Sequence, residues 1–498
     1  MKKLILSVAL ALSLAAVSFA LLYSAAQAPA ATEMTVDFAQ PIRVWDGFGV
    51  NYVQVAQTRD YKKWPQEYGG FSTLNETQRR QILDMIFGED GLKPGLLKMF
   101  LDPYHEGLTE ADNDNNDPNV INPSRFDHKT TTEWMRYFAR EGLARTRARG
   151  ADLEIITTLY GPQPWATKQK FVRGRDLDPR MKEEVAEYMI AWVKFLREEE
   201  KLPVRYISLH NEGDEIWRWP ADGSTAGTEN HDFNMYWPSS QIVDFLRFMR
   251  PMLDRQGLKD VGITPGECST WRNMAVAGIA WAIQNDPAAL RNLALLTSHG
   301  FGIGPNNVGI NAELLRINRP DLKTWTTSMS WGKMDVTFIE TIRQQIYMAH
   351  VNGVIPWAAV QTDTWIGGDP NPGTAFRVDR KGGYTVEPGY YFYKQVSRAG
   401  QPGMAVATVS QPSNNIGLIA FASNGTRHPD ALIAFNTSSS PAKARIRVSG
   451  TKAASFTAFA TSGQLRYQPA GTVAVKGGAV EVDIPAGGVV TLFGAQQR

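Results

Sequence analysis

The chain has 498 residues, with 52 lysines and arginines against 50 aspartates and glutamates and a formal net charge of +2. This length is enough for a conventional hydrophobic core and for more than one domain. The single cysteine, Cys268, excludes a fold held by internal disulfides and the usual structural zinc sites. The lack of a basic stripe argues against binding to nucleic acid or to an anionic membrane surface.

The first 30 residues have the pattern of an export signal. Lys2 and Lys3 precede an uncharged apolar run from Leu4 to Tyr23, and Ala28-Pro29-Ala30 offers a small-residue cleavage site. The alternative is an uncleaved membrane anchor, because the run is long enough to span a bilayer. Cleavage after residue 30 would leave 50 basic and 50 acidic residues, with no later segment apolar enough to cross a membrane. We therefore expect a periplasmic or secreted protein.

Residues 46–380 alternate between short apolar runs and amphipathic stretches, as repeated strand–helix units do. Apolar residues recur at helical spacing over Met181–Glu200 and over Val336–Val351. Eight repeats over this length predict a (β/α)8 barrel rather than an open doubly wound sheet. No glycine-rich nucleotide-binding motif follows any strand, so no cofactor is expected. The predicted strands are Gly47–Tyr52, Leu96–Asp102, Leu153–Leu159, Tyr206–His210, Val261–Pro265, Leu293–His299, Lys323–Thr327 and Val354–Val360.

Residues 381–498 have a different texture, in which helical periodicity stops and short alternating segments rich in Gly, Ser and Thr begin. Strands at this spacing are typical of a β-sandwich. Within residues 31–45, Met34–Val44 is also strand-like and is predicted to join the sandwich. The expected fold class is therefore α/β, a TIM barrel with a C-terminal β-sandwich that includes an N-terminal strand. The predicted sandwich strands are Ile416–Ala422, Ala431–Phe435, Ala444–Val448, Phe456–Thr461, Val473–Val475, Val480–Ile484 and Val489–Phe493.

In a barrel of this type the functional site forms where the strands end. Glu212, after the fourth strand, is the strongest candidate, because a carboxyl group in a partly apolar pocket can have its pKa raised enough to act as a general acid. The alternative is a loop carboxylate paired with Arg218. Asn211 can bond a sugar hydroxyl. Glu267 ends the fifth strand and His299 ends the sixth.

Tryptophans gather in the predicted loops after the strands. Flat apolar rings suit the CH faces of pyranose rings, and the indole N–H can donate to hydroxyls. Any single tryptophan could equally well serve to close the barrel mouth, but the presence of several favours a carbohydrate ligand. The predicted substrate-binding tryptophans are Trp165, Trp217, Trp271, Trp331 and Trp357, while Trp219 and Trp365 have similar positions.

Several short motifs follow one another in an order that resembles glycoside hydrolase family 30, whose members are clan A (β/α)8-barrel glycosidases. The resemblance extends over residues 34–495. It implies retaining hydrolysis of β-linked sugars, with Glu212 as the acid/base. The motifs are Gly47-Phe48-Gly49, Gln163-Pro164-Trp165, Leu209-His210-Asn211-Glu212, Pro265-Gly266-Glu267, the strand-end His299, Tyr390-Tyr391-Phe392-Tyr393, Gly400-Gln401-Pro402-Gly403 and Pro485-Ala486-Gly487-Gly488-Val489.

The chain departs from the family at the nucleophile, a glutamate at the end of the seventh strand. Alignment of Thr324–Thr327 with that strand puts Ser328 there, and no histidine base is evident to activate its hydroxyl. Lys98 lies about where the family usually has an arginine. A short, uncharged side chain at position 328 opens space for a water. Any hydrolysis is therefore predicted not to pass through residue 328, with inversion preferred and Ser328 contributing only to binding.

A second catalytic carboxylate must then come from another position. Glu267 is the first candidate, and its alternative role is to orient Glu212. Asp335, in the loop after the seventh strand, is the second candidate, although it immediately precedes a helix and can be its N-cap. Asp214 and Glu215 are also near. Substrate-assisted hydrolysis and a barrel that binds sugar without cleaving it are further alternatives.

The run from Asp112 to Asp117 alternates acidic and amide side chains, as calcium loops do. It lacks the central glycine and the terminal glutamate of an EF-hand loop, whose twelfth position here is Pro123. We interpret it as a solvated loop and expect no metal.

The whole sequence predicts an exported glycosidase acting on a β-linked oligo- or polysaccharide. The alternative, which Ser328 favours, is a catalytically lapsed carbohydrate-binding barrel. A carbohydrate is the expected partner in both cases, and nucleic acid is expected in neither.

Overall fold

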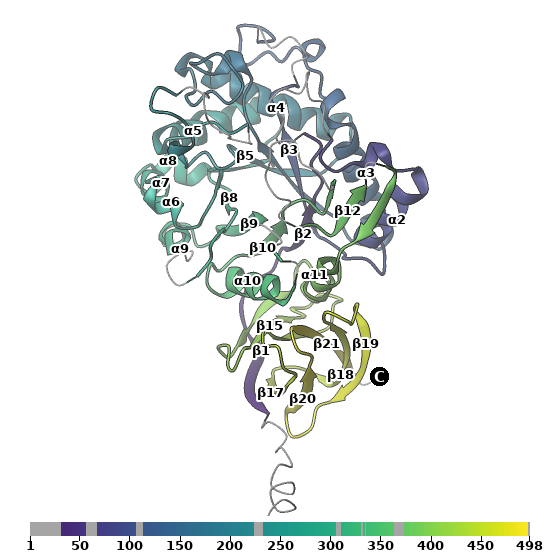
Figure 1. Cartoon of the computed structure of the whole chain (residues 1–498). Coiled ribbons are helices and arrows are strands. Elements are labelled where there is room, and N and C mark those ends of the chain that lie inside the picture. Colours follow the sequence, from purple (N-terminus) through teal and green to yellow (C-terminus); the bar gives the residue numbers. More distant parts are fainter. Residues whose placement is uncertain are drawn as a thin grey trace, which may run out of the picture.

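The computed structural model of the chain has two parts, a barrel and a smaller β domain, which meet across helices α10 (Val336–Tyr347) and α11 (Pro388–Ala399) (Figure 1). The predicted export signal at residues 1–30 lies outside the described residues. Within the described part of the chain, no helix is long and apolar enough to cross a lipid bilayer. The structure describes residues 31–55, 67–105, 113–223, 233–304, 310–329, 332–333, 335–362, 373–379 and 381–496.

The larger part is a barrel of parallel strands, which confirms the predicted (β/α)8 architecture. The fifth strand position is shared by β6 and β7, because Pro265 and Gly266, whose φ is 102°, interrupt that strand. β6 pairs with β5 and β7 pairs with β8, so the ring closes there. In ring order the strands are β6 (Gly262–Thr264), β5 (Val204–Ser208), β4 (Glu154–Leu159), β3 (Leu96–Leu101), β2 (Gly47–Asn51), β10 (Gly353–Pro356), β9 (Lys323–Met329), β8 (Leu295–Ser298) and β7 (Glu267–Cys268).

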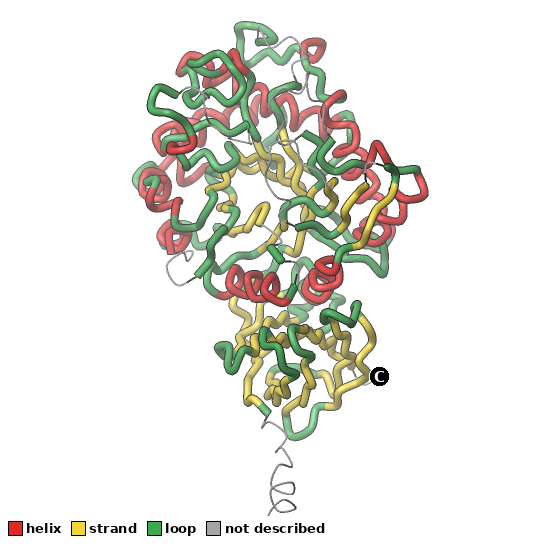
Figure 2. The backbone as a smooth tube through the Cα atoms, in the orientation of Figure 1, coloured by secondary structure: helices red, strands yellow, loops and turns green. Residues whose placement is uncertain are grey.

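Helices surround the strands on the outside of the barrel (Figure 2). The predicted helix Met181–Glu200 is α4, which buries its apolar side chains against the sheet because they recur at helical spacing. Trp192 on this face also donates from Nε1 to Oγ1 of Thr157 on β4, at 2.8 Å. The outer helices are α2 (Glu76–Phe87), α3 (Glu133–Ala148), α4 (Lys182–Glu198), α5 (Ser239–Arg255), α6 (Asn273–Val276), α7 (Ile279–Gln284), α8 (Pro287–Asn292), α9 (Ile310–Arg316) and α10.

The smaller part is the predicted β domain, and the N-terminal strand belongs to it. β1 (Thr32–Val44) lies between β14, to which it is antiparallel, and β17, to which it is parallel. Alternate side chains of β1 and β17, such as Val36 and Ile446, point into a separate apolar core. In sheet order the strands are β19 (Gln468–Ala474), β18 (Ala453–Thr461), β21 (Gly488–Gln496), β16 (Ala431–Asn436), β15 (Ile416–Ala422), β14 (Ala405–Val409), β1, β17 (Ala442–Ser449) and β20 (Ala479–Ile484).

The chain after the eighth barrel position differs from the prediction of one strand over Val354–Val360. β10 ends at Pro356, and the backbone turns at Ala358, whose φ of 28° is incompatible with an extended strand. Val360–Thr362 is instead β11, which pairs with β12 (Phe376–Asp379), and β12 pairs with β13 (Gly383–Val386). Strand β13 is therefore not part of the β-domain sheet, although the prediction placed residues 381–498 in the β-sandwich domain.

Helix α11 is a second correction, because helical periodicity was expected to stop after residue 380. The helix packs on both parts of the molecule, so it buries polar side chains, Lys394, Gln395 and Ser397, together with its apolar ones. On the barrel side, the hydroxyl of Tyr393 donates to the Gly49 carbonyl of β2 at 2.6 Å. On the other side the helix contacts β16, β18 and β21. The strands of the β domain that follow α11 begin with β14 at Ala405.

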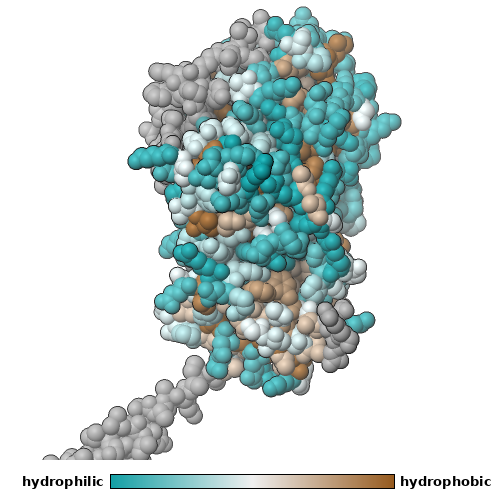
Figure 3. All heavy atoms as spheres, turned by 90° about the vertical axis from the view of Figure 1, so that its right-hand side faces the viewer, coloured by the Kyte–Doolittle hydropathy of each residue, from teal (hydrophilic) through white to brown (hydrophobic). Residues whose placement is uncertain are grey.

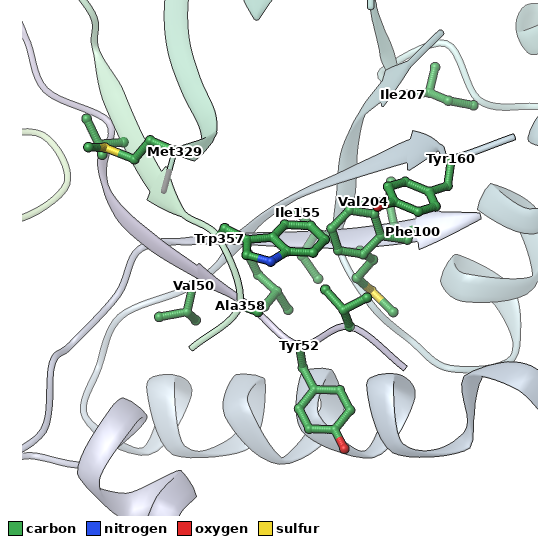
Figure 4. Packing of buried hydrophobic residues seen from close by; sticks show 14 of the residues in the cluster. Val50, Tyr52, Phe100, Ile155, Tyr160, Val204, Ile207, Met329, Trp357 and Ala358 are labelled. Carbon is green, nitrogen blue, oxygen red and sulfur yellow. The ribbon is translucent and has the colours of Figure 1, made fainter. Parts of the chain in front are cut away.

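Aromatic side chains fill the part of the barrel core beneath the strand ends. Trp357, directly after β10, packs edge-on against Phe100 of β3 with ring centroids 5.7 Å apart, and Phe100 packs in the same way on Tyr160 at 5.5 Å (Figure 4). The face in Figure 3 is mostly hydrophilic, with apolar side chains scattered over it. The polar strand-end side chains thus lie beside a packed aromatic cluster.

Candidate active site

A histidine joins two glutamates at the carboxyl ends of the barrel strands. Nδ1 of His299 lies 2.7 Å from Oε1 of Glu212, and its Nε2 lies 3.2 Å from Oε2 of Glu267. Carboxylate oxygens only accept hydrogen bonds, so the charged imidazolium is the form of His299 that makes both contacts. Burial lowers the pKa of His299, but Glu212 and Glu267 outweigh burial and raise it. The structure thus brings Glu212, Glu267 and His299 together where the barrel strands end.

The backbone at this site is strained. Glu212 and Ser328 have φ angles of 47° and 65°, in the left-handed region that non-glycine residues rarely adopt. Backbone bonds fix the same turn, since the amide of Glu212 donates to the Glu267 carbonyl and the amide of Glu267 donates to the His210 carbonyl, both at 2.8 Å. Strain of this kind persists where the surroundings dictate the conformation, and it is concentrated at functional sites.

The electrostatics of Glu212 differ from the sequence prediction. Burial raises the pKa of this carboxyl, but the charges of Arg218 and His299 outweigh burial and lower it well below its usual range. Arg218, on the short helix η6 (Ile216–Arg218), forms an ion pair with Glu212 and a second one with Glu215. The expectation of a raised pKa was thus wrong for this state, because the long Arg218 side chain folds back over the carboxylate. The alternative, pairing with Arg218, is present.

Glu267 lies at the bottom of the site, with no exposed surface. It forms an ion pair with Nζ of Lys98 and accepts a 2.8 Å bond from Oγ1 of Thr158. Burial raises its pKa, but Lys98 and His299 overcome this effect and lower it to about 2. A carboxylate held in this way fits the alternative role, orienting His299 and through it Glu212, better than direct catalysis.

Lys98 also explains the environment of Ser328. Its Nζ donates to Oγ of Ser328 at 2.7 Å and lies 4.7 Å from the centre of the Phe100 ring. A lysine that is ion-paired with Glu267 carries its proton and has no lone pair with which to activate a hydroxyl. Ser328 is therefore not an activated nucleophile. The ammonium of Lys98 also reaches into the space that the shorter side chain leaves, where the sequence predicted room for a water.

Asp335, the other candidate carboxylate, caps a helix. Its Oδ1 accepts from the amide of Thr337 at 2.8 Å and from the Thr337 hydroxyl at 2.6 Å, at the start of α10. These bonds satisfy the first turn of the helix, as the alternative interpretation held. We therefore withdraw the catalytic assignment of Asp335.

Two further carboxylates follow Glu212 and share a serine. Asp214 accepts from the amide and hydroxyl of Ser269, at 3.1 and 3.0 Å, and from Nδ2 of Asn273 at 2.7 Å. Burial is the main cause that raises the pKa of Asp214. Glu215 accepts from the Ser269 hydroxyl at 2.6 Å and keeps a partly exposed side chain. Of the two, only Glu215 combines a negative charge balanced by Arg218 with access to solvent.

The predicted tryptophans separate into different roles. Trp271 is buried and donates from Nε1 to Gln345 at 3.0 Å, so it supports the barrel and its prediction as a sugar contact was wrong. Trp165 and Trp357 keep only 7% and 9% of their surface exposed, enough for one ring edge. Trp217 on η6 is 66% exposed beside Arg218 and offers a whole ring face at the rim. Trp331 and Trp365 lie outside the described residues.

Of the other polar side chains at the strand ends, Asn211 was predicted as a site residue, whereas Gln163 and Tyr68 were not. Both amide atoms of Gln163, after β4, and Oδ1 of Asn211 are buried without a hydrogen-bond partner among the described residues. Buried polar atoms are normally paired, so these groups point to a bound water or ligand. Tyr68 accepts from Nε1 of Trp357 at 3.0 Å and donates to Gln361 at 2.8 Å. Gln163 lies two residues before Trp165, which was the available signal in the sequence.

Comparison with known proteins assigns this architecture to a class. No protein-family model and no curated protein sequence matches the chain. The fold is similar to that of solved structures named as glycoside hydrolase family 30 xylanases.

The similar structures include a GH30 endoxylanase from Clostridium papyrosolvens C71, with 17% identity and a TM-score of 0.64 over 93% of this chain and 100% of the other. The catalytic domain of GH30 xylanase C from Talaromyces cellulolyticus has 16% identity and a TM-score of 0.70, with coverage of 93% and 100%. An endo-β1,6-glucanase has 16% identity and a TM-score of 0.66, with coverage of 93% and 94%.

Proposed function

We propose that this protein is an exported glycoside hydrolase that acts on a β-linked oligo- or polysaccharide, with Glu212 as the general acid/base. The observation that carries the proposal is the chain of contacts Glu212–His299–Glu267, built on strained backbone where the barrel strands end. The amide atoms of Gln163 and the amide oxygen of Asn211, which have no partner among the described residues, support a ligand rich in hydroxyl groups. The similar structures, which are named as xylanases and a glucanase, support the same substrate class.

Arg218 determines when Glu212 can act as an acid. In the unliganded site Arg218 and His299 keep the carboxylate ionised. A sugar that binds at the barrel mouth separates Arg218 from Glu212. Burial, the strongest influence on the pKa of Glu212, then favours the protonated form of this carboxyl. The proton comes from His299 across the 2.7 Å contact and passes to the oxygen of the leaving group.

Water must then attack the sugar with help from a second carboxylate. We assign this role to Glu215, because Glu267 is fully buried and Asp335 is a helix cap. Glu215 shares Arg218 with Glu212, so the movement that frees one carboxylate also frees the other. In this scheme water displaces the leaving group in one step, with inversion at the anomeric carbon and without a covalent intermediate on Ser328.

The test is a screen of aryl β-glycosides and β-linked polysaccharides, with proton NMR of the first-formed anomer for any substrate that is cleaved. Glu212→Gln should lower the rate on a natural saccharide by roughly 10²–10⁴-fold, and less on substrates with good leaving groups, which need no protonation. Asp335→Asn is the matched control and should leave the rate unchanged. Unchanged activity of Glu212→Gln on a natural saccharide would rule out its role, and a sugar trapped on Ser328 would rule out the mechanism.

The second candidate function is a barrel that binds sugar without cleaving it. The observation that favours it is the contact between Lys98 and Ser328, where the family pattern has its nucleophile. In that case oligosaccharides bind in calorimetric titration, Glu212→Gln leaves the affinity within a few fold, and no saccharide in the screen is cleaved.

A further inference from the structure

Three carboxylates meet on the outside of the barrel, at a helix near the top of the view in Figure 1. Glu184 and Glu187 lie one turn apart on α4, and Asp114 comes from the loop after β3 that packs against this helix. One oxygen from each lies within 4.8 Å of the others. We call Asp114, Glu184 and Glu187 the carboxylate cluster.

No cationic side chain forms an ion pair with the carboxylate cluster within the described part of the chain. Glu187 is only 1% exposed, and neither of its carboxylate oxygens has a hydrogen-bond partner. Oε2 of Glu184 and Oδ1 of Asp114 are also buried without a hydrogen-bond partner among the described residues. Burying an ionised carboxylate without a partner costs several kcal/mol. Burial, followed by the charge of Asp114, accordingly raises the pKa of Glu187 to about 9.

Neighbouring cations do not supply the missing charge. Three basic side chains line a surface cavity of about 510 Å³ that also reaches Glu184. Each of them forms an ion pair with a carboxylate outside the cluster, so the cavity offers an ion a path to the cluster rather than a counter-charge. These pairs are Arg180–Asp178, Lys182–Asp244 and Arg247–Asp286.

We propose that the carboxylate cluster binds a hard divalent cation of the Ca²⁺ class. Ca²⁺ takes carboxylate oxygens at 2.3–2.6 Å. Three oxygens within 4.8 Å of one another can all lie about 2.8 Å or less from one ion, so a small inward movement of the side chains completes the contacts. The cluster contains only oxygen donors, which argues against zinc. Ca²⁺ accepts irregular coordination geometries. The cavity beside Glu184 leaves room for the waters that would complete its coordination shell.

The ion would fasten a loop to the barrel wall. Oδ2 of Asp114 accepts from Nδ2 of Asn115 and from the amide of Asn122, both at 2.8 Å, so this side chain already organises its own loop. Its free Oδ1 faces the helix. Further along the loop, Asn119 accepts from Arg255 and Gln256 at the end of α5. Metal binding would thus hold the loop against both α4 and α5.

The experiment uses the full chain, stripped with EDTA and desalted, titrated with CaCl₂ by isothermal calorimetry. We expect one Ca²⁺ per chain and a Tm about 2–5 °C higher in millimolar CaCl₂ than in EDTA at equal ionic strength. Glu187→Gln should weaken the affinity at least tenfold and abolish the Tm shift. Glu184→Gln is a second variant that should have the same effect.

Glu183→Gln is the matched control, because Glu183 precedes Glu184 on the same helix but is exposed. It should bind Ca²⁺ as the unmodified protein does. The proposal is overturned if the unmodified protein gives neither heat nor a Tm shift with Ca²⁺ up to 5 mM. It is equally overturned if both Glu187→Gln and Glu184→Gln bind Ca²⁺ with unchanged affinity and stoichiometry.

Discussion

The carboxylates at the strand ends and those of the carboxylate cluster have pKa values that are shifted in opposite directions. At the strand ends, Glu212 and Glu267 lie among Arg218, His299 and Lys98, and both of their pKa values are lowered in spite of burial. We call these five residues the strand-end site. In the carboxylate cluster the same degree of burial meets no cation, and the pKa of Glu187 is raised. Burial alone therefore does not decide the charge state of a carboxyl; the sign of its neighbours does.

The difference also concerns what each place requires to function. The strand-end site is balanced by the protein's own cations, so a neutral polar ligand such as a sugar can enter by displacing one of them. The carboxylate cluster lacks such a balance among the described residues, and only a proton or a metal ion can supply it. This contrast supports carbohydrate chemistry at the first place and cation binding at the second.

Removal of Lys98 should give the largest effect on stability. In Lys98→Met, Glu267 stays buried without its ion pair, which should lower the free energy of unfolding by about 3–5 kcal/mol. Urea denaturation at pH 7 measures the loss. The control is Lys443→Met, which removes an exposed ion pair with Asp483 and should cost about 1 kcal/mol or less. Equal losses in the two variants would show that the strand-end site is not balanced as described.

Removal of Arg218 should have a smaller, pH-dependent effect. Glu212 has a lowered pKa in the folded state, so it stabilises the fold above its unfolded pKa of about 4.3, and this share is lost as the pH falls through the folded value. Arg218→Gln removes one cause of the lowering. The variant should lose about 1–3 kcal/mol at pH 7, and its curve should approach that of the unmodified protein below pH 4.

Urea denaturation between pH 3 and pH 8 tests this expectation. Arg80→Gln, which removes an exposed ion pair with Glu76, is the control and should cost less than about 1 kcal/mol at pH 7. A loss in Arg218→Gln that stayed constant over the whole pH range would mean that Arg218 acts through packing rather than through the Glu212 charge.

The sequence predicted the fold well because the fold depends on local periodicity. The apolar runs of the barrel lie within a few residues of the observed strands, and Met34–Val44 joins the β domain as β1. The failures occur where packing on two sides buries polar residues, as in α11, or where one residue such as Ala358 turns the backbone.

The site was less predictable because it depends on contacts between distant segments. Glu212 and His299 could be located from their positions after strands, but the direction in which Arg218 turns is a property of the folded loop. The carboxylate cluster is the clearest case. Glu184 and Glu187 resemble an ordinary acidic helix turn, and Asp114 lies about 70 residues earlier in an interrupted calcium-like motif, so only the fold brings them together.

Metal-free protein should show the opposite pH dependence at the carboxylate cluster. The folded pKa of Glu187 is about 9, above its unfolded value, so the folded state holds the extra proton between about pH 4.5 and 9 and stability falls as the pH rises through that window. In EDTA, Glu187→Gln should remove this slope and be more stable than the unmodified protein at pH 8, because the neutral amide needs no proton. Glu183→Gln should keep the slope. Thermal denaturation in EDTA from pH 5 to 9 decides between a slope that persists and one that disappears.

The last change adds a negative charge to the strand-end site. In Ser328→Glu the new carboxylate is buried but lies within reach of Lys98, which already donates to position 328, so this cation offsets part of the cost of burying the charge. The effect of Ser328→Glu on chemistry should be qualitative. Double displacement needs two carboxylates about 5–5.5 Å apart. If the new carboxylate and Glu212 meet this requirement, an aryl β-glycoside should give the retained anomer in proton NMR. Ser328→Gln has nearly the same size without the charge and should give no retained product. If Ser328→Glu folds and binds sugar but yields only the inverted anomer, position 328 is not the counterpart of the family's nucleophile, and the balance at the strand-end site serves Glu212 alone.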